Sequence, residues 1–441
     1  MKRSISVFFT ALLLTAFSIG ASPNRTEAAG LEVGTKLQQI ISQVTQANLL
    51  EPVTNLATVG AVVTYEEMPS NDQIELLKNL GFQTKTFSQL PMVAISGTAA
   101  QIKHLLSSGL DARSIYYNKD LDYLSYTTGR EVIRADEVAR ELGYTGKGVT
   151  VAVIDSGIDA THPDLPFGEK VIQNVKFLVG GGLFGTESIY LENVIDTDTT
   201  SGHGTHVAGI IAGNGSASGG VFKGVAPDAK LVGLGVGEGI NIFWALAAFN
   251  YALEHQEEYN IQVISNSYGT TGEYSPDAPI NVASKKAHDA GMVVTFAAGN
   301  AGPDQNTLNP FSVAPWVISV AAGTKDKQLA DFSSRGVPGS KRLHPDITAP
   351  GVNIVSARAK TGLVGLTGVT TDVSYLEPQY IPYYTTLSGT SMATPEISGV
   401  AALMLEANPN LTPDQVLDIL KNTADPMEGY ETYEVGAGYA D

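Results

Sequence analysis

The sequence contains no cysteine, and this absence excludes several kinds of chemistry at once. Without cysteine, the 441-residue chain has no disulfide framework, no thiolate metal site and no cysteine nucleophile. The absence does not exclude export from the cell. It means that stability has to come from the size of the hydrophobic core or from bound ions.

Charged residues are scarce, and basic residues are the scarcer kind. Only 16% of the residues are charged, and 27 Lys and Arg face 45 Asp and Glu, which gives a formal net charge of −18. Because so acidic a surface repels phosphate groups, we expect neither nucleic acid nor an anionic membrane as a partner. Hydrophobic residues make up 43% of the chain, so we expect a globular protein of two or three domains.

Long apolar runs are missing except near the N-terminus. Residues 1–29 have the features of a signal peptide, because Lys2 and Arg3 precede an apolar run from Val7 to Phe17 and small residues follow. The run is shorter than the roughly 20 residues that a membrane-spanning helix needs. We therefore expect a secreted, extracellular protein with no membrane contact after signal cleavage; an uncleaved anchor is the alternative.

The next part of the chain has the pattern of a small α+β domain. Two capping boxes, Ser70 with Gln73 and Thr98 with Gln101, each predict the start of a helix. Strands are expected at 61–65, 83–87, 92–95 and 114–117. The resulting order, β-α-β-β-α-β, is that of a ferredoxin-like unit. We assign residues 30–57 to an N-terminal extension, 58–124 to this domain, and the polar stretch 118–130 to a linker or processing site.

Residues 125–441 read as a larger α/β domain. Their apolar runs are continuous rather than alternating, as expected for a parallel sheet that is buried on both faces. The expected strands are 149–154, 231–234, 263–264, 292–296 and 316–321, and the expected helices are 203–212, 242–258, 281–290 and one that starts at Thr412. This alternation predicts a doubly wound, mostly parallel sheet with its functional site at the carboxyl ends of the strands.

Four residues of this domain together supply the parts of acyl transfer. Asp155 and Asn300 each follow an apolar strand, whereas His203 and Ser391 each stand at the start of a predicted helix. Ser391 would attack a carbonyl carbon, His203 would accept its proton, and Asp155 would orient the imidazole ring. The Asn300 amide and the Ser391 N–H would hold the oxyanion.

These four sites stand in motifs that resemble those of the subtilisin family, the subtilases. The matching motifs are Asp155-Ser156-Gly157, His203-Gly204-Thr205-His206-Val207-Ala208-Gly209, Ala298-Gly299-Asn300 and Gly389-Thr390-Ser391-Met392-Ala393-Thr394-Pro395. The order Asp, His, Ser is also the one that the family uses. The resemblance covers about Arg130 to Asp441.

The resemblance implies a subtilisin-like fold and a serine endopeptidase that works through an acyl-enzyme intermediate. The preceding domain is similar to the family's inhibitory propeptide, which also acts as a folding chaperone. We therefore expect a zymogen that cuts itself between Asn118 and Arg130, is a monomer, and acts on polypeptide substrates. A catalytically silent binding protein with the same fold is the alternative. A lipase or esterase would need a G-x-S-x-G motif and the order Ser, Asp, His, which are absent around Ser391.

The same resemblance implies where a substrate would bind. Two segments are expected to pair with an extended peptide as edge strands, and a third to line the first specificity pocket. The residues are Leu234, Gly235 and Val236, then Ser267, Tyr268 and Gly269, and finally Ala297, Ala298 and Gly299. Small residues at the pocket predict cleavage after large hydrophobic side chains.

No cofactor is expected for the chemistry, and a structural calcium ion is left open. Asp164 matches a family position that often binds calcium, but the companion loop, residues 213–223, departs from the usual calcium-loop sequence. We interpret His206 as structural rather than as half of a metal pair with His203. Asp196 and Asp198 are interpreted as solvated loop carboxylates.

Two features depart from the family pattern. Glu396 follows Pro395 where subtilases usually have histidine, which we expect to change local packing but not activity. The segments 173–200 and 359–386 are longer than in compact relatives. Tyrosines of the second segment would either shape the substrate groove or cover the surface.

Overall fold

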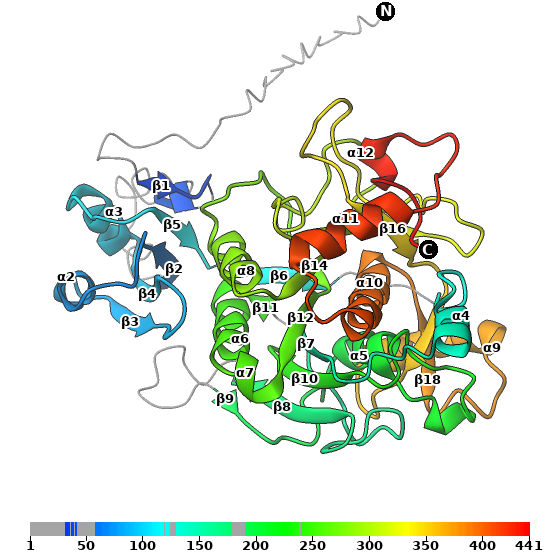
Figure 1. Cartoon of the computed structure of the whole chain (residues 1–441). Coiled ribbons are helices and arrows are strands. Elements are labelled where there is room, and N and C mark those ends of the chain that lie inside the picture. Colours follow the sequence, from blue (N-terminus) through cyan, green and yellow to red (C-terminus); the bar gives the residue numbers. More distant parts are fainter. Residues whose placement is uncertain are drawn as a thin grey trace, which may run out of the picture.

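The computed structural model describes residues 31–35, 37–38, 40–41, 58–118, 120–123, 129–178, 190–237 and 240–441 (Figure 1). The signal peptide predicted for residues 1–29 lies outside these ranges. In the ranges given, no helix is both long and apolar enough to cross a membrane.

The N-terminal unit contains the predicted β-α-β-β-α-β succession. Its elements are β1 (Glu32–Val33), β2 (Thr58–Thr64), α2 (Asn71–Asn79), β3 (Gln83–Thr86), β4 (Met92–Thr98), α3 (Ala99–Ser107) and β5 (Ser114–Tyr117). The strands form one sheet in the order β1-β5-β2-β4-β3. Both predicted capping boxes are present, so Ser70 and Thr98 do begin helices. Leu31 and Val33 are buried in this unit's core, so the unit begins before the predicted boundary at residue 58.

A larger sheet forms the centre of the molecule. Its strands are β7 (Thr150–Asp155), β8 (Val171–Phe177), β9 (Tyr190–Leu191), β10 (Lys230–Gly235), β12 (Ile261–Asn266), β14 (Val293–Ala297), β15 (Ile318–Gly323) and β16 (Ile347–Pro350). They lie in the order β16-β15-β14-β12-β7-β10-β8-β9, and only the edge strand β9 runs antiparallel to its neighbour. The predicted doubly wound, mostly parallel sheet is confirmed.

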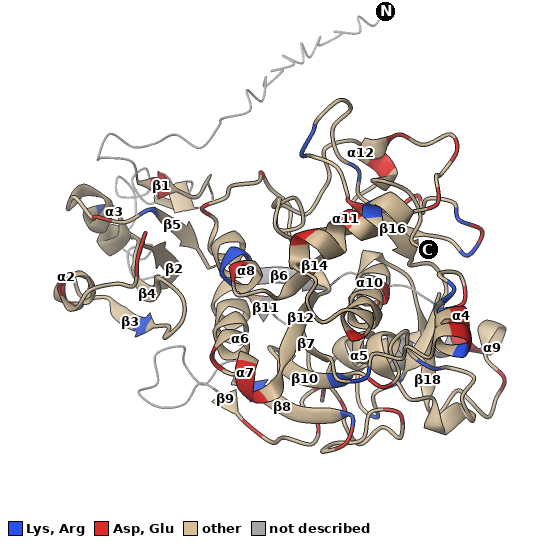
Figure 2. Cartoon of the chain, viewed as in Figure 1, with Lys and Arg blue, Asp and Glu red and all other residues tan. Residues whose placement is uncertain are grey.

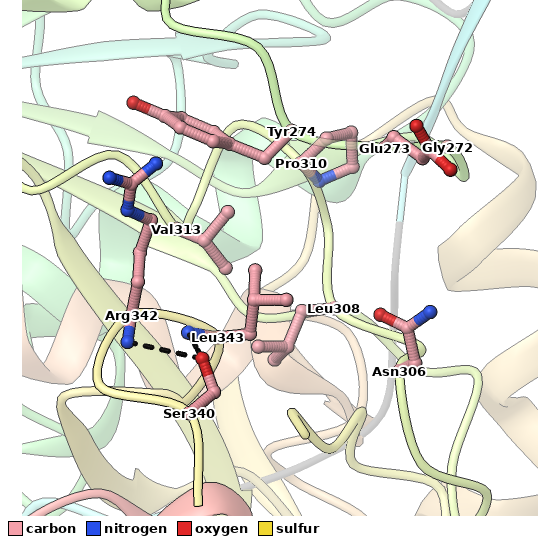
Figure 3. A pocket seen from close by; sticks show the side chains of 10 residues that line it. All are labelled: Gly272, Glu273, Tyr274, Asn306, Leu308, Pro310, Val313, Ser340, Arg342 and Leu343. Carbon is pink, nitrogen blue, oxygen red and sulfur yellow. Dashed lines mark hydrogen bonds between the residues drawn. The ribbon is translucent and has the colours of Figure 1, made fainter. Parts of the chain in front are cut away.

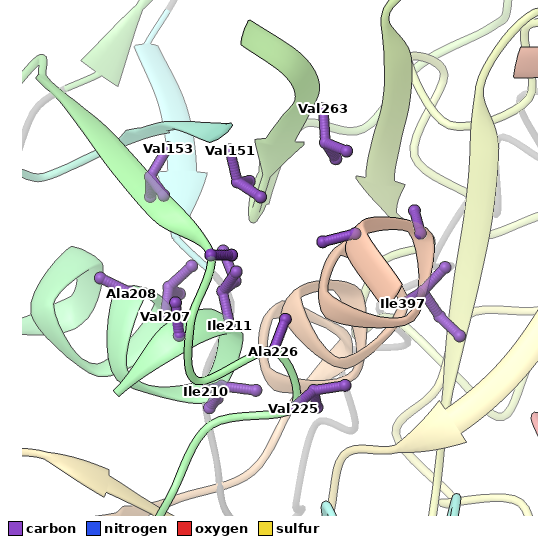
Figure 4. Packing of buried hydrophobic residues seen from close by; sticks show 14 of the residues in the cluster. Val151, Val153, Val207, Ala208, Ile210, Ile211, Val225, Ala226, Val263 and Ile397 are labelled. Atoms are coloured by element: carbon purple, nitrogen blue, oxygen red, sulfur yellow. The ribbon is translucent and has the colours of Figure 1, made fainter. Parts of the chain in front are cut away.

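Helices cover both faces of this sheet, and the side chains of the central strand alternate between them. Val151 and Val153 point into a cluster with α5 (His203–Ala212) and α10 (Thr390–Ala407), as Figure 4 shows. Ala152 and Ile154 point to the other face, which is covered by α6 (Ile242–Glu254) and α8 (Pro279–Asp289). The charged residues lie mostly in the outer helices and loops (Figure 2).

The N-terminal unit packs on the outer side of α6 and α8 (Figure 1). Its sheet contributes Val62, Met92 and Ala94 to the same hydrophobic cluster as those two helices. Polar contacts surround this cluster, including an ion pair between Arg113 and Asp277. The molecule therefore has five layers: α2 with α3, the small sheet, α6 with α8, the central sheet, and α5 with α10.

The remaining elements connect or extend these layers. They are β6 (Asp120–Tyr123), α4 (Ala135–Glu137), a π-helical turn (Val138–Leu142), a 3-10 turn (Ser216–Ser218), β11 (Ile240–Asn241), α7 (Gln256–Tyr259), β13 (Tyr268–Gly269), β17 (Ile354–Ala357), α9 (Leu363–Tyr375), β18 (Tyr384–Leu387), α11 (Pro413–Thr423) and α12 (Thr432–Val435). The predicted helix 242–258 is interrupted at His255 and forms α6 and α7. Helix α9 lies in the long segment 359–386, which connects the antiparallel strands β17 and β18.

Candidate active site

Three neighbouring strands of the central sheet bring polar residues to one edge. Strand β7 ends at Asp155, β12 is followed by Ser267, and β14 is followed shortly by Asn300. These strands are parallel and adjacent in the order β14-β12-β7. Because the carboxyl ends of parallel strands lie on the same side, the three polar residues converge there, as predicted for a site in a doubly wound sheet.

His203 begins α5 and is bonded to the Asp155 carboxylate. Its Nδ1 lies 2.7 Å from Asp155 Oδ1, and both side chains are almost completely buried. An Nδ1–H donated to a carboxylate leaves Nε2 as the proton acceptor of the neutral ring. The glycine that follows is required, because a Cβ on Gly204 would lie 2.2 Å from the Gly157 carbonyl oxygen.

A second buried carboxylate, Asp198, holds the start of α5 in place. Its Oδ2 accepts hydrogen bonds from the N–H and the hydroxyl of Thr205, at 3.0 and 2.6 Å. Its Oδ1 accepts from Gly202 N and Ser156 Oγ. Burial raises the pKa of Asp198 to about 6, although these hydrogen bonds oppose the shift.

The prediction that Asp198 is a solvated loop carboxylate is therefore wrong, since the residue is 1% exposed. The local pattern carries no signal for this role, because the N-cap position of α5 is Gly202 and Asp198 lies four residues before it. Asp196, predicted in the same way, is half-buried, and burial likewise raises its pKa.

Ser391 lies in the first turn of α10 and is tied to the end of β12 by two hydrogen bonds. Its hydroxyl donates to the Ser267 carbonyl oxygen at 2.7 Å. The Ser267 hydroxyl in turn donates to the Ser391 carbonyl oxygen at 2.9 Å. That carbonyl lacks its usual helical donor, because Pro395, four residues on, has no N–H. Ser267 thus replaces the missing bond and fixes the helix start against the sheet.

The amide of Asn300 is oriented by a residue that sequence reasoning did not single out. Its Oδ1 accepts hydrogen bonds from the N–H and the hydroxyl of Thr390, at 3.0 and 2.9 Å. The Thr390 hydroxyl also accepts from Gly299 N at 3.1 Å. With the oxygen held by Thr390, the NH₂ group of Asn300 faces the other way as a donor.

The chain's own segment β6 lies between two short strands beside this site. It pairs antiparallel with β11, where Leu121 faces Ile240. It also pairs antiparallel with β13, where Tyr123 faces Tyr268 and Asp122 faces Gly269. The stretch predicted as a linker or processing site therefore contains a strand in the middle of a three-stranded sheet.

The structure corrects one of the two predicted peptide-binding edges. Ser267, Tyr268 and Gly269 do lie at an edge that pairs with β6. Leu234 and Gly235 do not, because β10 is paired on both sides, with β7 and β8. Val236 donates its N–H to the Asp155 carbonyl oxygen. The segment that pairs with β6 on this side is Ile240–Asn241, which follows β10 in the sequence.

The predicted pocket residues lie at the point where β12 and β14 diverge. Ala297 and Ala298 are fully buried, and Gly299 adopts a positive φ of 112°. Asn309 bridges the two strand ends, because its Nδ2 donates to the carbonyl oxygens of Tyr268 and Ala297, at 3.1 and 2.9 Å. Asn309 is a second residue that sequence reasoning missed.

The residues around Asp164 do not fit a calcium ion. Its Oδ2 accepts a hydrogen bond from the Tyr384 hydroxyl at 2.7 Å, and its Oδ1 accepts from Ala217 N at 2.8 Å. Protein donors thus stand where a cation would need free oxygens. In the described part of the chain, no group of three or more His, Cys, Asp or Glu could hold a metal ion.

His206 is a structural residue. Its Nε2 lies 3.0 and 3.1 Å from the carbonyl oxygens of Ile354 and Thr385. Burial lowers its pKa to about 3, so the ring is neutral and donates to β17 and β18. It therefore helps to hold α5 against the strand pair β17 and β18.

Glu396 is a buried acid one turn beyond Ser391. It is 1% exposed, and within the described part of the chain its Oε2 has no hydrogen-bond partner. Burial raises its pKa well above the usual range, and the attraction of Arg130 only partly opposes this.

Comparison with known proteins gives consistent similarities. Residues 146–438 match the subtilase family of peptidases. The chain is 34% identical to serine protease AprX of Bacillus subtilis (strain 168) over 370 residues, which are 80% of this chain and 78% of that protein. It is 33% identical to subtilisin DY of Bacillus licheniformis over 67% of this chain and 90% of that protein.

Solved structures show the same fold. Fervidolysin from Fervidobacterium pennivorans, described as a keratinolytic enzyme related to subtilisin, superposes with a TM-score of 0.65 at 23% identity. The superposition covers 88% of this chain and 61% of that one. This coverage is more than residues 129–441 alone could supply, so the likeness in fold extends into the N-terminal unit. Sphericase superposes over 67% of this chain and 92% of its own, with a TM-score of 0.53 at 28% identity.

Proposed function

The chain belongs to the subtilase family of serine proteases, and we propose that it is a secreted endopeptidase made as an autoprocessed zymogen. The observation that carries the proposal is the convergence of Asp155, His203 and Ser391 with Asn300 at one edge of the sheet. The hydrogen bond between His203 and Asp155, 2.7 Å long, supports a general base of defined tautomer there.

In the proposed reaction, the Ser391 hydroxyl turns from the Ser267 carbonyl toward His203 Nε2. The oxygen forms a bond to the scissile carbonyl carbon while its proton passes to the imidazole ring. Asn300 Nδ2 and the Ser391 N–H stabilise the oxyanion. The imidazolium then donates its proton to the departing amine as the C–N bond breaks, and a water molecule hydrolyses the resulting ester by the same sequence of proton transfers.

The N-terminal unit is proposed to be the inhibitory propeptide. Strand β6 takes the place that an extended substrate would occupy, with β11 and β13 as the pairing edges. This arrangement shifts the proposed substrate edge from residues 234–236 to Ile240–Asn241. Because β6 ends at Tyr123, we propose that the autocatalytic cut falls between Tyr123 and Gly129, which narrows the predicted interval of 118–130.

The proposal is tested by labelling with a fluorophosphonate probe, followed by mass spectrometry of the intact protein. Wild type should lose the segment up to the cut and carry one label on Ser391. Ser391→Ala should remain full length and unlabelled. Ser388→Ala, which removes a neighbouring hydroxyl of the same loop, serves as the matched control and should behave as wild type.

Two results would contradict parts of the proposal. A folded, shortened wild-type protein that takes no label would refute the protease function and favour the silent binding protein. Equal shortening of wild type and Ser391→Ala, each purified from a host without extracellular proteases, would show that processing is not autocatalytic.

A further inference from the structure

A cavity of about 670 Å³ lies next to the candidate active site. Part of its lining is apolar, because Leu308, Val313 and Leu343 lie together there (Figure 3). Leu308 and Val313 also form a cluster with Ala298, one of the residues between the end of β14 and Asn300. The volume lies in the range of pockets that enclose a small organic group.

The cavity lies close along the chain to a strand that pairs with β6. One of its walls is Gly272–Tyr274, which begins three residues after the end of β13. Strand β13 pairs with β6 through Tyr268 and Gly269. A side chain of a peptide bound along β13 can therefore enter the cavity, and its backbone would remain paired at the strand edge.

One side of the cavity carries a positive charge. The guanidinium of Arg342 lies over the ring of Tyr274, 5.1 Å from the ring centroid. Its loop is held in shape by the Ser340 hydroxyl, which accepts the N–H groups of Arg342 and Leu343 at 3.3 and 3.0 Å. Glu273 is the one other charged residue among those that line the cavity, and in Figure 3 it lies at the opposite end.

A cavity that combines an apolar surface with a guanidinium suits one kind of side chain. The stem must be large and hydrophobic, and the tip must accept a hydrogen bond, because Arg has only donors to offer. Among the natural side chains tyrosine combines both properties. Phenylalanine fills the same space without an acceptor, and lysine would bring a second positive charge to Arg342.

We propose that Arg342 is a specificity-determining residue of this protease and favours tyrosine over phenylalanine immediately before the cleaved bond. The inference rests on the proposed function and goes beyond it by naming the residue that reads the tip of the side chain. A hydrogen bond from a charged donor at a partly exposed wall should favour tyrosine about five-fold in kcat/KM.

The test uses the matured protein and peptide anilides that differ only in the residue before the cleaved bond, with tyrosine, phenylalanine or lysine there. Wild type should show a Tyr/Phe ratio of about five, and Arg342→Ala should bring the ratio to about one. Arg342→Glu should raise the relative rate for lysine. Lys341→Ala, which removes a neighbouring exposed cation that does not line the cavity, should keep the wild-type ratio.

A binding measurement separates this proposal from the proposed function. Fluorescence anisotropy of cleaved peptides that end in tyrosine or phenylalanine should give the same preference without turnover. If no anilide is hydrolysed, the proposed function fails, and the anisotropy ratio still decides the role of Arg342. A wild-type ratio near one, or a ratio that survives in Arg342→Ala, would overturn the proposal.

Discussion

Replacing Glu396 by glutamine should stabilise the protein, and should do so more strongly at high pH. Glu396 is buried on α10, and one of its oxygens has no hydrogen-bond partner among the residues that the structure describes. Burial raises its pKa well above the usual value of 4.5. An acid whose pKa is raised by folding contributes stability below its unfolded pKa and loses that contribution as the pH rises through the folded pKa. The wild type therefore becomes progressively less stable above about pH 4.5, and Glu396→Gln removes this loss.

The size of the effect follows from the cost of an unsatisfied buried polar group, which is about 1–3 kcal/mol. Glutamine fills the same volume and still needs hydrogen-bond partners, so the gain should fall toward the lower end, roughly 1 kcal/mol near pH 8. Arg130 limits the gain further. Its guanidinium loses a favourable interaction with the Glu396 carboxylate, although it keeps its ion pair with Asp136.

The assay is thermal unfolding from pH 5 to pH 9 in the Ser391→Ala background, in which we expect no self-digestion. Glu406→Gln is the matched control on the same helix, because the Glu406 carboxylate accepts the N–H groups of Thr145 and Gly146, both at 2.6 Å. It should destabilise the protein, opposite in sign to Glu396→Gln. A Glu396→Gln variant that is less stable than its parent at pH 8 would show that the carboxylate has a partner and would refute the reasoning.

Three further substitutions test the candidate site and the N-terminal unit. Thr390→Val removes a hydroxyl that orients Asn300, so kcat should fall about ten-fold with little change in KM; equal changes in both would argue against an oxyanion role. Asp198→Ala leaves buried donors at the start of α5 unpaired and should lower both activity and stability, the latter by about 3 kcal/mol. Asp196→Ala removes one acceptor, that of the Asp198 N–H, and should lower both by less. Arg113→Ala breaks the partly buried ion pair with Asp277 and should weaken inhibition by the cleaved N-terminal unit about five-fold. The measurement is the delay between self-cleavage and the appearance of activity, which should be shorter in Arg113→Ala than in the wild type. An unchanged delay would contradict this role.

Loss of Asn300 itself should be more severe than loss of Thr390. In subtilisin, a relative of this chain, removal of the corresponding type of donor costs about 10²–10³ in kcat; the magnitude is taken from that enzyme and does not come from this structure. Thr390 acts through Asn300, so its removal leaves the donor present but less well aligned, which explains the smaller expected effect.

The parts of the fold that could be predicted from sequence are those with a local physical cause. The continuous apolar runs correctly predicted strands β7, β10, β12, β14 and β15, because a strand that is buried on both faces has apolar side chains on both. The capping boxes at Ser70 and Thr98 fixed two helix starts because both hydrogen-bonding partners lie within four residues. Strands β17 and β18 were missed because their stability comes from pairing with each other and packing on α5.

The residues of the candidate site likewise include some that the sequence predicted and some that it did not. Asp155, His203, Asn300 and Ser391 could be named because each stands at the end of a strand or the start of a helix. The roles of Asp198, Thr390 and Asn309 depend on contacts with residues that the local pattern does not identify as partners. The edge formed by Ile240–Asn241 was misplaced because it is defined by its pairing with β6, 120 residues earlier in the chain, and short strands of this kind have no periodic signal.

The same dependence on distant pairing explains how the proposed zymogen would be inhibited. While the chain is uncut, β6 is tethered to the groove, and its effective concentration there exceeds that of any free substrate. Once the bond is cut, this advantage is lost. After the cut, the N-terminal unit is bound to the rest of the molecule by the hydrophobic cluster that it shares with α6 and α8 and by the Arg113–Asp277 ion pair. The Asn118 side chain adds a hydrogen bond that it accepts from Phe243 N at 3.0 Å. The lifetime of the inhibited complex after the cut should therefore depend on the docked face of the N-terminal unit, whereas the cut itself should depend on Ser391.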